Sequence, residues 1–361
     1  MLALAGCSAT TVNDNPSGGA ACATPAKKED VHIYLGIGTL DNDYFQDFIT
    51  GVNTMAAAIG LSDDQVSVYT DDYDGQKLID TMSSVLATAK NGDIIIADPA
   101  SSAYTKSLVE LAQSKGVRIV TIWNRPGDIH PWDTGGGCWI AHQSFDMIQA
   151  SQETSQALFD AIGGEGGIVA IDGVPDNPTA QERKLGLARA LAANPGVTLL
   201  DSQPADWQAA KAQAVTEQFL GKYGDQISAV WGGNDDMGFG AVEALRAQGK
   251  SGKVPSNGLD GTQKALKAIQ SGEFAASAVV PGIEEGLVTT TLAYAATVGD
   301  LDVSKLTNEQ RDFYLKVGVA TAANVVDFLT PFDLSAVTYE AYLANPWKLS
   351  SGQVRDEVPS E

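Results

Sequence analysis

Short apolar runs alternate with longer segments of helical periodicity along most of the chain. Most of the runs start about 20 to 35 residues apart, the length of a strand with its crossover helix. This repetition predicts an α/β protein with doubly wound parallel sheets that carry helices on both faces. The predicted strands are His32–Ile37, Val66–Thr70, Ile94–Ala97, Val117–Trp123, Ile168–Ile171, Val197–Leu200, Ile227–Trp231, Gly258–Leu259 and Ala276–Val280.

One segment breaks this alternation and predicts a crossing between two lobes. Pro126–Gly137 is rich in Pro, Gly and Asp and precedes the short apolar run Cys138–Ala141. Further crossings are expected at Pro281-Gly282 and within Val317–Val326. A three-segment hinge of this kind would let two lobes close on a ligand in the cleft between them. The expected lobes are 31–140 with 282–325 (N-terminal) and 141–281 with 326–361 (C-terminal), preceded by a tether at 1–30.

Polar and aromatic residues follow the predicted strands at their carboxyl ends, where open α/β sheets bind ligands. In Gly232–Gly238, for example, Asn234 lies between an apolar run and a helical segment, which Asp235 or Asp236 can cap. A mixture of carboxylates, amides, guanidinium groups and rings suits a sugar, because hydroxyls both donate and accept and C–H faces stack on rings. The residues in such positions are Asn42, Tyr44, Phe45, Asn124, Arg125, Arg183, Trp207, Asn234 and Asp260.

These segments also resemble the motifs of type I periplasmic sugar-binding proteins of the ribose-binding group, the soluble receptors of ABC importers. The resemblance covers about residues 31–296 and implies the periplasmic binding protein type I fold. It implies that Asn42 hydrogen-bonds the sugar, that rings at 44, 45 and 207 stack on it, and that Arg125, Arg183 and Asp260 anchor it. The matching segments are Leu40–Phe45 (family LNNPFF), Trp123–Arg125 (LDR), Ala180–Arg183 (A-R-E-R), Gln203–Trp207 (QPADF), Asn234–Met237 (NDEM) and Leu259–Thr262 (FDGT).

The chain departs from the family pattern at three positions. Asn124 replaces an aspartate, His142 stands at a serine-type position, and Val280-Pro281 replaces a glutamine. The departures imply that ribose need not be the preferred ligand. His142 either donates to a ligand hydroxyl or packs in the hinge.

Several candidate residues could have a structural role instead of contacting a ligand. Asn177, in the loop Pro175-Asp176-Asn177-Pro178, is expected to form a turn rather than to contact ligand. The remaining candidates have structural alternatives. These are helix-core packing for Tyr44 and Phe45, an ion pair with Glu182 or a surface acid for Arg183, cover of a lobe edge for Trp207, and capping of the following helix for Asp260.

Composition narrows the function further. The 361 residues are 44% hydrophobic and 19% charged, which is typical of a globular protein. A formal net charge of −22 argues against nucleic acid as a partner. The sequence has no complete dinucleotide or phosphate loop, no nucleophile elbow and no paired histidines. We therefore expect no enzyme activity, no cofactor and no metal site.

The N-terminal residues suggest a location. Leu4-Ala5-Gly6-Cys7 matches a bacterial lipobox, in which Cys7 is lipidated after cleavage, although the apolar stretch before it is short. A chance match is the alternative. Ser8–Lys28 has the small and polar composition of a flexible tether. Cys22 and Cys138 either form one disulfide outside the cytoplasm or remain free thiols.

The expected function is that of a monomeric, lipid-anchored, extracytoplasmic receptor that delivers a monosaccharide or polyol to an ABC permease. A receptor that presents its ligand to a chemoreceptor or sensor kinase is the alternative, and a non-sugar ligand remains open.

Overall fold

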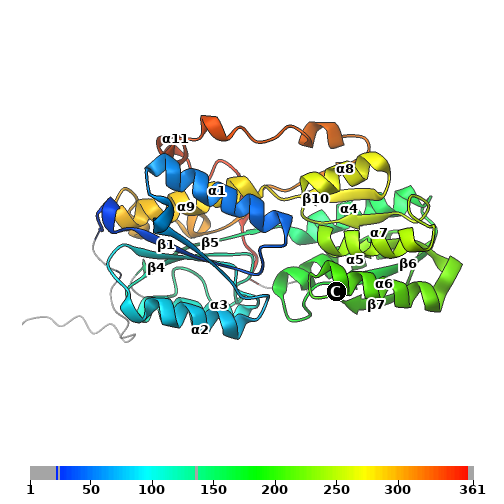
Figure 1. Cartoon of the computed structure of the whole chain (residues 1–361), viewed down its shortest axis with the longest axis horizontal. Helices are drawn as coiled ribbons and strands as arrows, with labels where there is room; N and C mark the ends of the chain where they lie inside the picture. The colour runs from blue at the N-terminus through cyan, green and yellow to red at the C-terminus, as the bar shows by residue number, and fades with distance from the viewer. Residues whose placement is uncertain (1–21, 23–24, 135–136, 357–361) are drawn as a thin grey trace, which may run out of the picture.

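The computed structural model describes residues 22, 25–134 and 137–356, which form two α/β lobes side by side (Figure 1). Each lobe is built on its own sheet, and nearly all strand pairs within the two sheets are parallel. The predicted pair of parallel-sheet lobes is therefore confirmed. The lipidation candidate Cys7 and most of the expected tether lie outside the described residues.

The N-terminal lobe contains a seven-stranded sheet in the order β13-β11-β5-β4-β3-β1-β2. Only the edge strand β13 pairs antiparallel within it. Helices α1 and α9 cover one face, and α2 and α3 cover the other (Figure 1). The strands are β1 (His32–Ile37), β2 (Val66–Thr70), β3 (Asp93–Ala97), β4 (Arg118–Ile122), β5 (Trp139–Phe145), β11 (Asp312–Leu315) and β13 (Ser350–Gln353), and the helices are α1 (Asp43–Ile59), α2 (Gly75–Val85), α3 (Ser102–Ser114), α9 (Gly282–Val298), α10 (Asn308–Arg311) and α11 (Tyr339–Ala344).

The C-terminal lobe contains a six-stranded sheet in the order β12-β10-β9-β8-β6-β7, with β12 antiparallel at one edge. The strands are β6 (Gly166–Asp172), β7 (Val197–Pro204), β8 (Ile227–Gly232), β9 (Ser256–Gly258), β10 (Phe274–Val279) and β12 (Gly318–Thr321). The helices are α4 (Met147–Ala161), α5 (Pro178–Ala193), α6 (Ala209–Tyr223), α7 (Asp235–Ala247) and α8 (Gln263–Ser271).

Alternation along β6 shows how both faces of the second sheet are buried. Ile168 and Ala170 belong to one apolar cluster, with Leu158 of α4. Val169 and Ile171 belong to the other, which includes residues of α6 and α7. A strand covered on both sides carries apolar residues continuously, because its successive side chains point to opposite faces. This is why short, unbroken apolar runs predicted the strands well.

The lobe boundaries differ from the expected ones. Residues 141–145 stay in the first sheet as the end of β5, because β5 pairs with β4. The segment Pro126–Gly137 therefore connects two strands of one sheet and is not a crossing. Residues 318–321 belong to the second sheet as β12, and residues 350–353 return to the first as β13. The three hinge crossings lie between β5 and α4, between β10 and α9, and between β11 and β12.

A fourth segment passes from one lobe to the other. After the 3-10 helix Val325–Phe328 on the C-terminal lobe, the chain runs along the top of the molecule to α11, which packs on α9 (Figure 1). Tyr339 at the start of α11 donates to Asp300 (2.8 Å). The chain then adds β13 to the first sheet, so its C-terminal part lies against the hinge.

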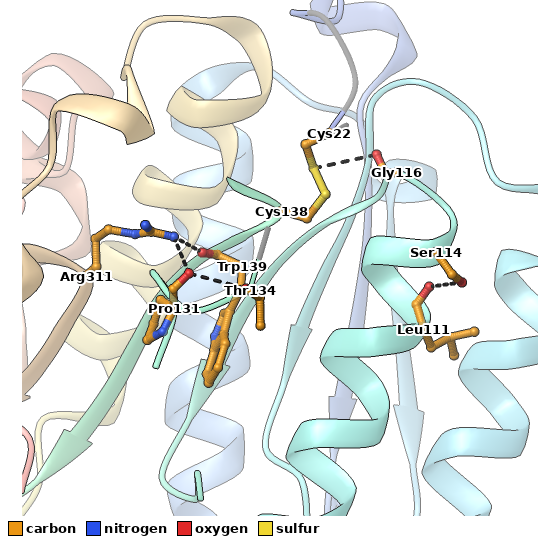
Figure 2. The surroundings of a disulfide bond; sticks show 9 residues. All are labelled: Cys22, Leu111, Ser114, Gly116, Pro131, Thr134, Cys138, Trp139 and Arg311. Carbon is orange, nitrogen blue, oxygen red and sulfur yellow. Dashed lines mark hydrogen bonds between the residues drawn. A yellow bond between two sulfur atoms is a disulfide. The ribbon is translucent and has the colours of Figure 1, made fainter. Parts of the chain in front are cut away.

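A disulfide links Cys22 to Cys138, directly before β5, with a Cα–Cα distance of 5.1 Å (Figure 2). The sequence left open whether Cys22 and Cys138 form a disulfide or remain free thiols, and the structure contains the disulfide. The bond attaches the segment before β1 to the N-terminal lobe. Within the described part of the chain, none of the helices combines the length and apolar character needed to span a membrane.

Candidate functional site

A cavity of about 460 Å³ lies between the two lobes, at the carboxyl ends of the parallel strands. Eight of the ten candidate residues line it, and the other two do not. Its lining is Asn42, Tyr44, Phe45, Tyr73, Asp98, Ala100, Trp123, Asn124, Asn177, Thr179, Arg183, Trp207, Asn234 and Asp260.

Hydrogen bonds between the lobes surround this cavity. Asn42 Nδ2, at the start of α1, donates to Asp236 Oδ2 of α7 (2.9 Å). Thr179 Oγ1 of α5 donates to Asn124 Oδ1, which follows β4 (3.2 Å). Asn177 Nδ2 donates to the carbonyl oxygen of Ala100 (2.9 Å). The lobes are therefore closed around the cavity.

Three asparagines at helix starts line the cavity. Asn42, Asn177 and Asn234 are the N-caps of α1, α5 and α7, and the Oδ1 atom of each accepts from a backbone N–H of its helix. An asparagine cap leaves its NH₂ group free to donate elsewhere. Those of Asn42 and Asn177 donate across to the other lobe, whereas Asn234 Nδ2 has no hydrogen-bond partner among the described residues. It is available to a ligand.

The capping role expected for Asp235 or Asp236 is therefore wrong. Asp235 is buried and accepts from Thr262 N and Oγ1 (both 2.8 Å) and from Ser277 Oγ (2.6 Å). Asp235 thus ties the start of α7 to the neighbouring strand end, while Asp236 points to Asn42 in the other lobe.

The aromatic walls of the cavity carry unusual backbone conformations. Among the described residues, the non-glycine positions with positive φ are Tyr73 (62°), Trp123 (63°) and Trp207 (65°), together with Asp72 and Asp206, which directly precede two of them. Such conformations cost on the order of 1–3 kcal/mol each and concentrate at binding sites. Gly173 lets the Trp207 ring approach, because a Cβ atom at that glycine would meet the ring at 2.2 Å.

Arg183 lies between two of these rings. Its Cζ atom is 5.5 Å from the Trp123 ring centroid and 5.1 Å from that of Trp207, in cation–π range. Its Nη1 donates to the carbonyl oxygen of Gly233 (2.5 Å), and its Nη2 lies 3.5 Å from Asp260 Oδ1. Its Nε is buried and has no hydrogen-bond partner in the described structure. The structural alternative for Arg183, an ion pair with Glu182 or a surface acid, differs from what the structure contains, since its partner is the buried Asp260.

Burial shifts the acidic groups of the cavity toward their neutral forms. Desolvation raises the pKa of Asp260 to about 7, with Arg183 opposing the shift and Asp235 adding to it. Desolvation also raises the pKa of Asp98 well above its usual range, and the nearby carboxylates of Asp71 and Glu285 add to this. A ligand that donates to these carboxylates would favour their ionised forms.

A buried network supports the cavity from below. Trp123 Nε1 donates to Tyr44 Oη (2.6 Å), and the Tyr44 hydroxyl donates to Glu285 Oε2. Burial raises the pKa of Glu285 to about 8. Tyr44 and Phe45 therefore line the cavity and also belong to the core of the N-terminal lobe, so their packing role is observed and their contact with a ligand stays a prediction.

The structure does not place Arg125 and His142 at this cavity. Arg125 is buried behind it, where its Nη2 lies 2.9 Å from Asp312 Oδ2 and its Nε donates to Asp312 Oδ1 (3.2 Å). The remaining Arg125 donors reach backbone carbonyls that include those of Pro126 and Val354. His142 is fully buried in β5, with Nδ1 2.9 Å from Thr121 Oγ1. Desolvation lowers the His142 pKa well below its usual value.

Sequence reasoning missed several cavity residues. Asp98 directly follows a predicted strand, so the rule that identified the other candidates applied to it as well. Asn177, which the sequence assigned to a turn, is the N-cap of α5 and also lines the cavity. No periodic pattern marked Tyr73 or Thr179. Within the described ranges, we find no cluster of three or more His, Cys, Asp or Glu side chains suited to a metal ion.

Comparisons with known proteins agree with this arrangement. The model of the periplasmic binding protein domain matches residues 33–301. The chain is 28% identical to a ribose import binding protein of Haemophilus influenzae over 72% of its length and 82% of that protein. It is 30% identical to the D-allose-binding periplasmic protein of Escherichia coli, over 66% and 76%. A crystal structure of a twin-arginine translocation pathway signal protein from Burkholderia phytofirmans aligns with a TM-score of 0.84 and 33% identity, over 90% of this chain and 98% of the other.

Proposed function

Because this chain belongs to the periplasmic binding protein family, we propose that it is a receptor that captures a monosaccharide or polyol for an ABC importer. Membership of this family implies a location outside the cytoplasm. The two lobes would close on the ligand by bending at the hinge, and a permease would recognise the closed form.

The observation that carries the proposal is the chemistry of the inter-lobe cavity. Rings at Tyr73, Trp123 and Trp207 provide flat apolar faces, while Arg183 and Asp260 provide a donor and an acceptor. A sugar ring presents both kinds of surface at once. The names of the two relatives, which specify ribose and D-allose, support the same ligand class.

A thermal-shift panel of pentoses, hexoses, deoxysugars and polyols tests this proposal, with calorimetry on each hit. A ligand present at 100 times its Kd should stabilise the protein by about 2.7 kcal/mol. If no sugar or polyol raises the melting temperature while an amino acid or another metabolite does, the proposed ligand class is wrong.

We propose further that Cys7 carries a lipid and that the receptor is monomeric. The lipobox-like sequence before Cys7 and the composition of the tether support the anchor. Mass spectrometry of the membrane fraction, with Cys7→Ala as the comparison, should find lipid only on the unaltered chain. Light scattering of the purified body should give the mass of one chain.

Import and signalling make different predictions once a ligand is known. Deleting the gene should abolish high-affinity uptake of the labelled ligand if the receptor serves a permease. Unchanged uptake combined with a lost chemotactic or transcriptional response would favour the signalling role.

A further inference from the structure

The acidic and basic side chains that line the cavity are unequal in number. They are two carboxylates, Asp98 and Asp260, and one guanidinium, Arg183. Arg183 is already paired with Asp260, across 3.5 Å. For Asp98, the described part of the structure contains no ion pair. The cavity therefore retains one carboxylate with no cation paired to it.

One carboxylate oxygen of Asp98 accepts a hydrogen bond from the protein, and the other does not among the described residues. Its backbone N–H donates to the carbonyl oxygen of Gly36 (2.9 Å), which fixes the residue at the end of β3. Its Oδ1 accepts from Asn124 Nδ2 (3.2 Å). Its Oδ2 has no hydrogen-bond partner in the described ranges. A ligand in the cavity can therefore use this oxygen.

Asn124 cannot take the place of Asp98 as a ligand acceptor. Its Nδ2 donates to Asp98 and to the carbonyl oxygen of Pro99 (3.0 Å), and its Oδ1 accepts from Thr179 Oγ1. The carboxylate of this part of the cavity therefore stands at the end of β3, and Asn124 orients it.

A desolvated carboxylate without a cation is costly, and a charge-assisted hydrogen bond to an ammonium group is about twice as strong as a neutral one. We propose that Asp98 selects a ligand that carries a protonated amino group besides its hydroxyls, so that the cavity holds an amino sugar or an aminopolyol. This inference rests on the proposed function, since it specifies the polyhydroxy compound that occupies the same cavity.

The test uses calorimetry with matched pairs of compounds that differ by one amino group in place of one hydroxyl. Suitable pairs are D-glucose with D-glucosamine, D-galactose with D-galactosamine, and myo-inositol with its monoamino-deoxy derivative. At least one amino compound should bind about tenfold more tightly than its hydroxyl parent. Asp98→Asn should remove this preference by weakening the amino compound about tenfold more than its hydroxyl parent. Asp43→Asn, an exposed change of the same charge, should leave both affinities unaltered.

The outcomes distinguish a failure of this inference from a failure of the proposed sugar-receptor function. If hydroxyl parents bind as tightly as every amino compound, or more tightly, the role given to Asp98 is wrong and the sugar receptor stands. If Asp98→Asn weakens the amino compound and its hydroxyl parent equally, Asp98 does not discriminate between a charged and a neutral ligand. This result also overturns the inference. If neither kind of compound binds, the proposed function itself fails.

Discussion

Two buried arginines, each expected to hold the ligand, have opposite surroundings in the cleft and in the hinge. Arg125, in the hinge, makes a close, two-point contact with Asp312 and donates its other N–H groups to protein oxygens. Arg183, in the cleft, has a longer contact with Asp260, two aromatic neighbours and an unpartnered Nε. The contacts of Arg125 are thus complete without a ligand, whereas those of Arg183 are not.

The two arginines differ in whether each of their buried N–H groups has a hydrogen-bond partner. Buried polar atoms without partners are rare because each costs free energy, and a binding site is where that cost can be recovered when a ligand arrives. The free Nδ2 of Asn234, the free Oδ2 of Asp98 and the free Nε of Arg183 all belong to the cleft lining, as far as the structure describes their partners. This comparison predicts that hinge substitutions alter stability and that cleft substitutions alter binding.

The largest effect is expected for Arg125→Ala. The substitution removes both Arg125 contacts of the buried Asp312 carboxylate and leaves it, among the described residues, only His130, whose Nδ1 lies 3.2 Å from Asp312 Oδ2. We therefore expect a loss of about 3–5 kcal/mol in the free energy of unfolding. Urea unfolding measures this loss, with the exposed Arg189→Ala as the matched control. A variant as stable as the unaltered protein would show that the hinge pair contributes little.

The second effect concerns Arg183→Ala, which should weaken ligand binding with little change in stability. Hydrogen bonds from a charged group are worth about 1.5–3 kcal/mol, so the Kd should rise by about ten- to a hundredfold. Stability should change little because Asp260, with a pKa already raised to about 7, can become neutral when its partner is removed. Calorimetry and urea unfolding on the same preparation measure both quantities, and unaltered affinity would remove Arg183 from the site.

The contrast between these arginines also explains how far sequence reasoning reaches. Both residues follow a predicted strand, and the local pattern around them is the same in kind. What turns Arg125 away from the cleft is Asp312, 187 positions later in the chain. No local pattern contains that partner, and the same holds for His142, which is enclosed by its own sheet.

The strands show the complementary case. Runs such as Ile94–Ala97 predicted central strands because both faces of the sheets are covered, and these residues are fully buried. The four-residue strands β11, β12 and β13 escaped prediction, because such short segments carry too little periodicity. The lobe boundaries were misplaced for that reason. The positive φ values of the cavity aromatics likewise depend on tertiary contacts.

A third prediction concerns Glu285, the buried acid that accepts a hydrogen bond from Tyr44, and the pH dependence of stability that it causes. The pKa of Glu285 is raised to about 8 by burial, from an ordinary value of 4.5, so the folded state holds its proton more tightly than the unfolded state. Stability should therefore fall as the pH rises from about 4.5 to 8, by up to about 1.4 kcal/mol per pH unit from this residue.

Glu285→Gln should remove this dependence. Relative to the unaltered protein, the variant should gain stability steadily between pH 5 and pH 8 and show no further gain above that range, where Glu285 is ionised in both states. Melting temperatures measured across that range test the prediction, with the exposed Glu309→Gln as the control. A constant difference between the two proteins would mean that Glu285 does not titrate as a buried acid.

The smallest effect is expected where the hinge and the closing lobes meet. Arg355, after β13 of the N-terminal lobe, contacts Asp146 at the start of α4, and its Nη1 lies 3.6 Å from Glu182 of α5. Tyr314 of β11 donates to the same Glu182 (3.2 Å). These contacts join the lobes from the side of the C-terminal segment, so they favour the closed form without touching the cavity. Because Arg355 is about one-third exposed, solvent screens its ion pairs to roughly 1 kcal/mol or less.

Arg355→Gln should therefore raise the ligand Kd by about fivefold at most, entirely through the equilibrium between open and closed lobes. Small-angle scattering should show a larger radius of gyration for the unliganded variant and the same radius for both proteins at saturating ligand. A ligand can shift the lobes only by its differential affinity for the two forms, so saturation must erase the difference. A higher Kd with unchanged scattering would instead mean that Arg355 affects the binding site directly. Cleft and hinge would then not act separately.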